Sequence, residues 1–257
     1  MLIEADATDP AAVGPAVSAT RALAESVFNR DLPGPLSRLR AKPGPVDFRI
    51  HAHYNPENIT QYNIVPGLMG VVLTMTMVVI TALAITRERE RGTMENLLAT
   101  PVRPFEVMTG KILPYIAVGY VQVTLILLAA HFIFHVPMVG SFMLLYGVSL
   151  FFIAANLAMG ITFSTLAKNQ LQAVQMAFFF FLPSILLSGF MFPFRGMPEW
   201  AQWIGTCLPN THFLRIARGI LLKGNGLAEI APELWPLLLF LTVAMTVGVK
   251  RYRQTLD

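Results

Sequence analysis

The chain has 257 residues, of which 54% are hydrophobic and 13% charged, and its formal net charge is +4. Soluble domains carry about 25% charged residues, so the composition excludes an ordinary soluble domain and predicts an all-α polytopic membrane protein. The single cysteine, Cys207, excludes an internal disulfide and a cysteine-based metal cluster. Basic residues gather beside apolar runs, which indicates membrane topology rather than nucleic-acid binding.

Residues 1–63 have the character of a soluble domain. Residues 1–5 can form a short strand, 10–27 are alanine-rich and compatible with a helix, and 31–45 contain four prolines and predict a loop. Val46 to Tyr54 alternate apolar and polar side chains, which is typical of a half-buried strand. We therefore expect a partial α/β domain over 1–63.

Five apolar runs follow, each long enough to cross a hydrocarbon core of about 30 Å. They predict a transmembrane domain over 64–257 with spans at roughly 64–86, 112–136, 141–166, 171–193 and 233–250. The connection 87–111, Lys168 and the tail are basic, and the positive-inside rule places them in the cytoplasm. Residues 1–63 are then extracytoplasmic.

The connection 194–232 falls on the same outer side, and we expect re-entrant or interfacial helices there. Its aromatic residues suit headgroup depth, and its basic side chains suit snorkelling to the interface. The polar start of the chain must be exported, yet Met1 is followed by neither a signal peptide nor a membrane helix. The chain therefore looks like the later part of a six-helix protein.

The stretch from Thr86 to Lys111 holds four arginines, one lysine and four glutamates between the first two spans. Opposite charges three residues apart can pair along a helix that leaves the membrane, and Gly92 interrupts that helix. Thr93 can cap a second short helix, on which Met94, Leu97 and Leu98 form one apolar face. This face suits either leucines that dip into lipid or a helix that binds a groove on a cytoplasmic protein.

The same stretch resembles the segment between the second and third membrane helices of ABC-2-type exporter permeases with a large extracytoplasmic domain. Its sequence is RERERGTMENLLATPVRPFEVMTGKILPY. Further similarities are Tyr54-Asn55-Pro56-Glu57-Asn58, Ile64-Val65-Pro66-Gly67, Leu187-Ser188-Gly189-Phe190, Phe192-Pro193, Met197-Pro198, Leu208-Pro209 and Arg218-Gly219-Ile220. The resemblance implies an ABC-2 permease-like helical bundle that lacks the family's first membrane helix and most of its extracytoplasmic domain.

The resemblance also implies a function, namely ATP-driven export of a hydrophobic or amphipathic substrate across the cell inner membrane. In this family the short helix around Gly92 to Leu98 is a coupling helix that docks on an ATPase subunit. The coupling residues are then Arg87, Glu88, Arg89, Glu90, Arg91, Gly92, Thr93, Met94, Glu95, Leu97 and Leu98. Charge reversal at Glu88 or Glu90 should uncouple ATP hydrolysis from transport.

The expected partners follow from what the sequence lacks. It has no phosphate-binding loop of the form G-x-x-x-x-G-K-[ST], so ATP hydrolysis must come from another polypeptide. We expect cytoplasmic ABC ATPase subunits that hold ATP and Mg²⁺, a second permease that is identical or paralogous, and membrane lipids. We expect no nucleic acid, and no cofactor or metal bound by this chain itself.

Two alternative functions stay open at this point. His131 and His135 are four residues apart on one helix face, which would suit an intramembrane haem-binding or enzymatic protein. No second pair exists in a partner helix, however, and interfacial or packing roles are favoured. An ion-coupled carrier is less favoured, because such carriers usually need carboxylates inside their crossings. The weakly polar groups that could line a translocation path are Thr74, Gln122, Asn156 and Gln175.

Overall fold

The computed structural model describes residues 2–6, 10–29, 49–55, 57, 59–91 and 104–254. The chain divides into two compact units, residues 1–63 and 64–257. The first unit contains β1 (Leu2–Asp6), α1 (Pro10–Asn29) and β2 (Arg49–His53). The two strands pair in parallel, with Leu2 opposite Arg49 and Asp6 opposite His53. The predicted loop over 31–45 lies outside the described residues.

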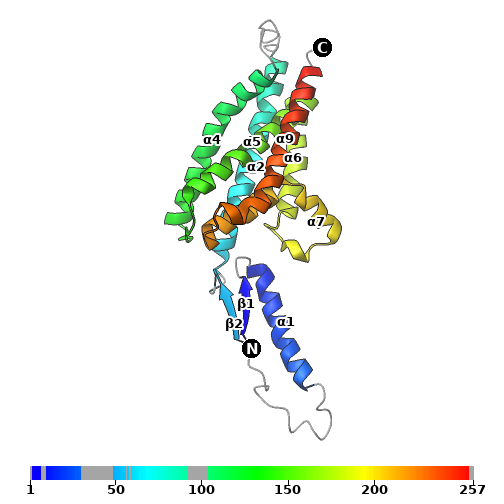
Figure 1. Cartoon of the computed structure of the whole chain (residues 1–257). Helices are drawn as coiled ribbons and strands as arrows, with labels where there is room; N and C mark the ends of the chain where they lie inside the picture. Colours follow the sequence, from blue (N-terminus) through cyan, green and yellow to red (C-terminus); the bar gives the residue numbers. More distant parts are fainter. Residues whose placement is uncertain are drawn as a thin grey trace. The chain divides into compact units, whose positions relative to one another are not determined.

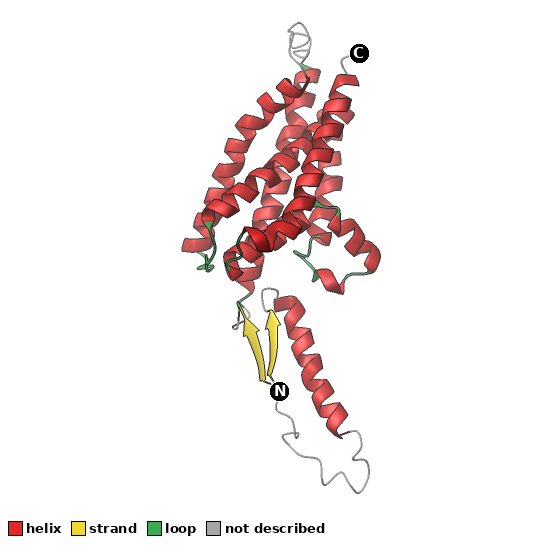
Figure 2. Ribbon diagram, in the orientation of Figure 1, coloured by secondary structure: helices red, strands yellow, loops and turns green. Residues whose placement is uncertain are grey.

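The second unit is a bundle of long helices that run side by side (Figures 1 and 2). They are α2 (Thr60–Glu90), α4 (Pro104–Phe132), α5 (Phe142–Leu166), α6 (Gln170–Leu187) and α9 (Leu227–Gln254). Each contains a segment long and apolar enough to cross a membrane, with mean hydropathy between 1.5 and 2.4. The protein therefore has the multi-pass helical architecture that its composition predicts.

Two predicted spans run past the ends of their helices. The span at 112–136 ends in the structure at Phe132, because His135 takes a left-handed backbone conformation with φ 51° and Pro137 follows it. The span at 171–193 ends at Leu187, because Gly189 adopts φ 84°, a conformation that glycine takes without steric cost.

The last predicted span starts too late. The hydropathy pattern predicts this span at 233–250, whereas α9 begins at Leu227 and continues through Pro232 and Pro236. Prolines inside membrane helices are tolerated where neighbouring groups satisfy the freed backbone carbonyls. As a result, Glu229 and Glu233 lie within the helix that carries the span.

Short helices occupy the connection between α6 and α9. They are η2 (Phe194–Gly196), α7 (Glu199–Thr206), α8 (Pro209–Arg218) and the π-helical turn η3 (Gly219–Lys223). Helix α7 exposes Trp200 and Trp203, as expected of an interfacial helix. Helix α8 is buried and packs on α5, α6 and α9, so of the two alternatives, re-entrant or interfacial, it does not fit the interfacial one. Its Phe213 stacks on Phe152 of α5 with ring centroids 4.0 Å apart.

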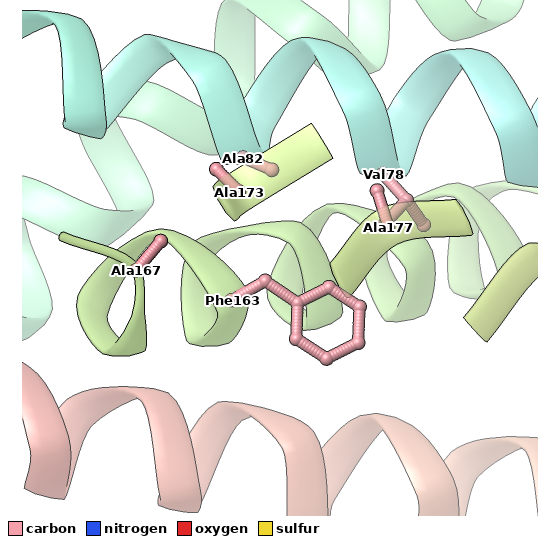
Figure 3. Packing of buried hydrophobic residues seen from close by; sticks show 6 residues of the cluster. All are labelled: Val78, Ala82, Phe163, Ala167, Ala173 and Ala177. Carbon is pink, nitrogen blue, oxygen red and sulfur yellow. The ribbon is translucent and has the colours of Figure 1, made fainter. Parts of the chain in front are cut away.

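Small side chains hold α2, α5 and α6 together. The buried cluster in Figure 3 consists of Val78, Ala82, Phe163, Ala167, Ala173 and Ala177. Alanine at helix contacts lets backbones approach closely, which favours dispersion contacts between helices in a membrane. One turn from Phe163, Gly160 of α5 packs so tightly on α2 that an added Cβ would lie 2.6 Å from the carbonyl oxygen of Val78.

Candidate functional site

The predicted coupling stretch begins on the last turn of α2. This helix is regular to its end, where the backbone N–H of Arg91 donates to the carbonyl of Arg87 at 3.1 Å. The side chains of Arg87 and Arg91 are exposed, and that of Glu88 is half-buried. The remaining predicted residues, Gly92, Thr93, Met94, Glu95, Leu97 and Leu98, lie outside the described residues, as does the side chain of Arg89. Their coupling role stays a prediction.

Glu90 joins the end of α2 to the start of α6. Its carboxylate accepts one hydrogen bond from the backbone N–H of Gln170 at 2.8 Å and another from the side-chain amide of the same residue. Gln170 is the first residue of α6, where free N–H groups and the helix dipole favour negative charge. These hydrogen bonds from Gln170 hold the pKa of Glu90 below its ordinary value.

Side chains of neighbouring residues also cap the N-terminus of α6. The side chain of Asn169 accepts from the backbone N–H of Gln172 at 2.8 Å, and the side-chain oxygen of Gln172 accepts from the N–H of Lys168 at 2.8 Å. This arrangement differs from a capping box only in that the Gln172 side chain bonds the N–H of Lys168, one residue before the N-cap Asn169. Because Glu90 bonds the N–H of Gln170, the end of α2 completes the cap of α6. We call the Glu90–Gln170 contact the α2–α6 junction.

A second polar cluster joins α8 to α9, at the end of the bundle where α7 lies in Figure 1. The carboxylate of Glu233 lies 2.6 Å from Nδ1 of His212 and accepts from Arg215 at 3.0 Å. Nε2 of His212 lies 2.8 Å from the carbonyl oxygen of Thr206, so both ring nitrogens face oxygen atoms. A neutral imidazole has only one N–H. The cluster is therefore fully hydrogen-bonded when the His212–Glu233 pair carries one extra proton.

Arg215 departs from the behaviour expected of a basic side chain in this connection. Instead of snorkelling, its guanidinium is held between the carboxylate of Glu233 and the ring of Phe194, whose centroid is 4.5 Å away. The sequence carried a weak signal for this cluster, since His212 and Arg215 are three apart on one helix. It gave none for Glu233, which the prediction placed at the first residue of a span.

The four residues predicted to line a translocation path differ in their surroundings. Thr74 and Asn156 are fully buried, and Asn156 donates to the carbonyl of Phe152 in its own helix at 2.9 Å. Gln122 of α4 accepts from the hydroxyl of Thr76 of α2 at 2.8 Å, and Gln175 is exposed. None of these four side chains lines the 650 Å³ cavity described below. Their role in a path stays a prediction.

His131 and His135 are both exposed and line that cavity. Within the part of the chain that the structure describes, no group of three or more His, Cys, Asp or Glu side chains could hold a metal ion. The alternative of an intramembrane haem-binding or enzymatic protein finds no support in this arrangement.

Five apolar helices, with polar contacts joining α2 to α6 and α8 to α9, define a multi-pass membrane protein. The chain belongs to the ABC-2 family of transporter proteins, whose family model matches residues 10–250. The resemblance inferred from the charged stretch is thereby confirmed.

Several relatives are permeases. The chain is 32% identical over 213 residues to the probable multidrug ABC transporter permease YbhR of Escherichia coli K12, which covers 83% of this chain and 57% of YbhR. It is 36% identical over 181 residues to the probable multidrug ABC transporter permease YbhS, covering 70% and 48%. It is 31% identical over 243 residues to the inner membrane transport permease YhhJ, covering 90% and 63%. The chain thus spans less than two thirds of the length of these relatives.

Proposed function

We propose that the chain is the permease subunit of an ATP-driven exporter, working with a second permease and with separate cytoplasmic ABC ATPase subunits. The ATPases bind ATP and Mg²⁺, and the permeases move a hydrophobic or amphipathic substrate out across the cell inner membrane. Membership of the ABC-2 family and the names of YbhR and YbhS support this function. Residues 1–63 then belong to an extracytoplasmic α/β domain.

The observation that carries the proposal is the α2–α6 junction. In sequence, Glu90 directly precedes the stretch that resembles the coupling helix of the family. A force applied there reaches α2 first, and the hydrogen bonds from Gln170 transmit it to the first turn of α6. Glu90 is therefore placed to pass the closure of an ATPase to two membrane helices at once.

The small-residue cluster extends this transmission to α5. Val78 and Ala82 of α2 belong to one buried cluster with Phe163 of α5, Ala167 directly after α5, and Ala173 and Ala177 of α6 (Figure 3). Close-packed helices transmit displacement because their interface has no loose side-chain layer to absorb it. In this proposal α2, α5 and α6 rock as one body and open a path between the two permeases.

The test begins with the partner. The tagged chain, purified from its own membrane, should bring down a protein that carries a Walker-type phosphate-binding loop, and the complex should hydrolyse ATP. Transport by the chain without any ATPase would instead indicate an ion-coupled carrier.

The junction is then tested within that complex. Glu90→Lys should leave the chain in the membrane and uncouple ATP hydrolysis from transport, because a cation replaces the acceptor at the N-terminus of α6. Glu199→Lys, at an exposed position on α7, is the matched control and should stay coupled. Transport at the wild-type rate by Glu90→Lys would refute the proposal that the α2–α6 junction transmits the closure of the ATPase.

A further inference from the structure

A cavity of about 650 Å³ lies between the end of α4 and the start of α5. Its volume falls within the range of about 300–1,000 Å³ that is usual for small-molecule sites. Most of its wall is apolar and includes Leu127, Leu128, Phe132 and Phe142. Such walls suit the hydrocarbon or aromatic body of a ligand.

The two hydroxyl groups in the cavity wall have no hydrogen left for a ligand. The hydroxyl of Thr124 donates to the carbonyl of Tyr120 at 2.8 Å. The hydroxyls of Thr124 and Tyr146 are 2.8 Å apart, so the hydrogen between them must come from Tyr146. Side-chain hydrogen-bond donors for a ligand therefore come from the two imidazoles in the wall.

These imidazoles belong to His131 and His135. The backbone at His135 has φ 51°, which is uncommon outside glycine and asparagine and costs about 1–2 kcal/mol. Strain of this size persists where the surroundings fix it, here through hydrogen bonds from the N–H groups of Phe134 and Val136 to the carbonyls of Ala129 and Ala130 at 3.1 and 2.9 Å. The turn holds His135 in the wall of the same cavity that His131 lines.

The charge of the wall selects the ligand. Among the described residues that line the cavity there is no aspartate, glutamate, lysine or arginine. The histidines are thus the only wall groups that can become positive, and a cationic ligand would meet no counter-charge. Imidazoles that donate to an anion make charge-assisted hydrogen bonds, which are stronger than neutral ones.

From these features we infer that the cavity binds one amphipathic molecule with an apolar chain region and an anionic headgroup. The headgroup lies at His131 and His135, and the chain lies along Leu127 and Leu128. The site goes beyond the proposed function and does not depend on it, because binding needs no ATPase.

The test uses the purified full chain in phosphatidylcholine nanodiscs at pH 6. Three fluorescent probes carry identical alkyl chains. They differ only in the headgroup, which is a sulfonate, an alcohol or a trimethylammonium. We expect the sulfonate to bind about tenfold more tightly than the alcohol, as one net charge-assisted hydrogen bond would give. The trimethylammonium should bind no more tightly than the alcohol.

Two substitutions locate the site. His131→Gln keeps the helix, and His135→Asn keeps the left-handed turn, because asparagine tolerates positive φ. The double variant should lose the preference for sulfonate, whereas the control Thr242→Ala, at an exposed position on α9, should keep it. Equal binding of the three probes, or an unchanged preference in the folded double variant, would overturn the inference.

A final arm identifies the source of the ligand. Phosphatidylglycerol is added to the nanodiscs in increasing proportion while the sulfonate probe is bound. Displacement of the probe assigns the site to an anionic bilayer lipid, and retention assigns it to a free single-chain amphiphile. Both results keep the site as an anion-selective one.

Discussion

Gly160→Ala is the substitution whose effect the structure defines best. The alanine Cβ would lie 2.6 Å from the carbonyl oxygen of Val78 and 3.0 Å from Cβ of Thr81, where an ordinary contact begins near 3.4 Å. The shortfall at the carbonyl is about 0.8 Å. Because this neighbour is backbone, it cannot rotate away, and α2 and α5 must separate.

Two effects of opposite sign set the magnitude. Replacing glycine by alanine inside a helix stabilises it by about 0.5–1 kcal/mol. Overpacking a tight contact costs about 1–3 kcal/mol, and a clash with backbone belongs at the upper end. We therefore expect Gly160→Ala to lower the free energy of unfolding by about 2 kcal/mol, or about 4–8 °C in Tm at roughly 2–4 °C per kcal/mol.

Thermal unfolding of the detergent-purified chain, followed by fluorescence-detected gel filtration, measures this shift. Gly147→Ala on the same helix is the matched control, because no atom lies within 4 Å of its added Cβ. Gly147→Ala gains the higher helix propensity of alanine without a steric clash, so it should not lower Tm. If Gly160→Ala were as stable as Gly147→Ala, the close contact between α2 and α5 would be wrong.

Three further predictions follow from the polar groups. Glu233→Gln should lower stability by about 2 kcal/mol, since His212 and Arg215 lose their shared carboxylate; an unchanged Tm would contradict the cluster. Because the pKa of Glu90 is lowered in the folded state, its stabilising effect is fully present above about pH 4.5 and lost as the pH falls through the folded value. The difference in Tm between the wild type and Glu90→Gln should therefore shrink on acidification, and growth of the difference would refute the junction. Cys207 is exposed, and the proposed topology places it outside. A membrane-impermeant maleimide should label it in intact cells, but should not label Met94→Cys in a Cys207→Ser background.

The spans were predictable because each apolar run exceeds the length that a bilayer requires. Their ends were not, since a left-handed turn at His135 depends on local hydrogen bonds and not on hydropathy. Apolar residues continue past Phe132 and past Leu187, so the hydropathy pattern carries no mark where α4 and α6 stop.

The polar junctions were harder to predict. Glu90 and Gln170 are 80 positions apart, and Glu233 is 21 positions from His212, so neither pairing has a local sequence signal. The role of Gly92 to Leu98 rests on family membership alone, because these residues lie outside the described part of the chain. The burial of Ala173 and Ala177 was not predictable either, since an alanine that faces lipid and one that faces a helix look alike in sequence.

The burial of α8 has a consequence for biogenesis. This helix is ten residues long, too short to cross a bilayer alone, and its His212 and Arg215 find their carboxylate on α9. The ribosome makes Glu233 after both partners, so α8 must wait at the membrane surface until α9 has entered. We expect the docking of α9 to be the closing step of assembly, and a nascent chain halted before Glu233 to remain open to proteases at α8.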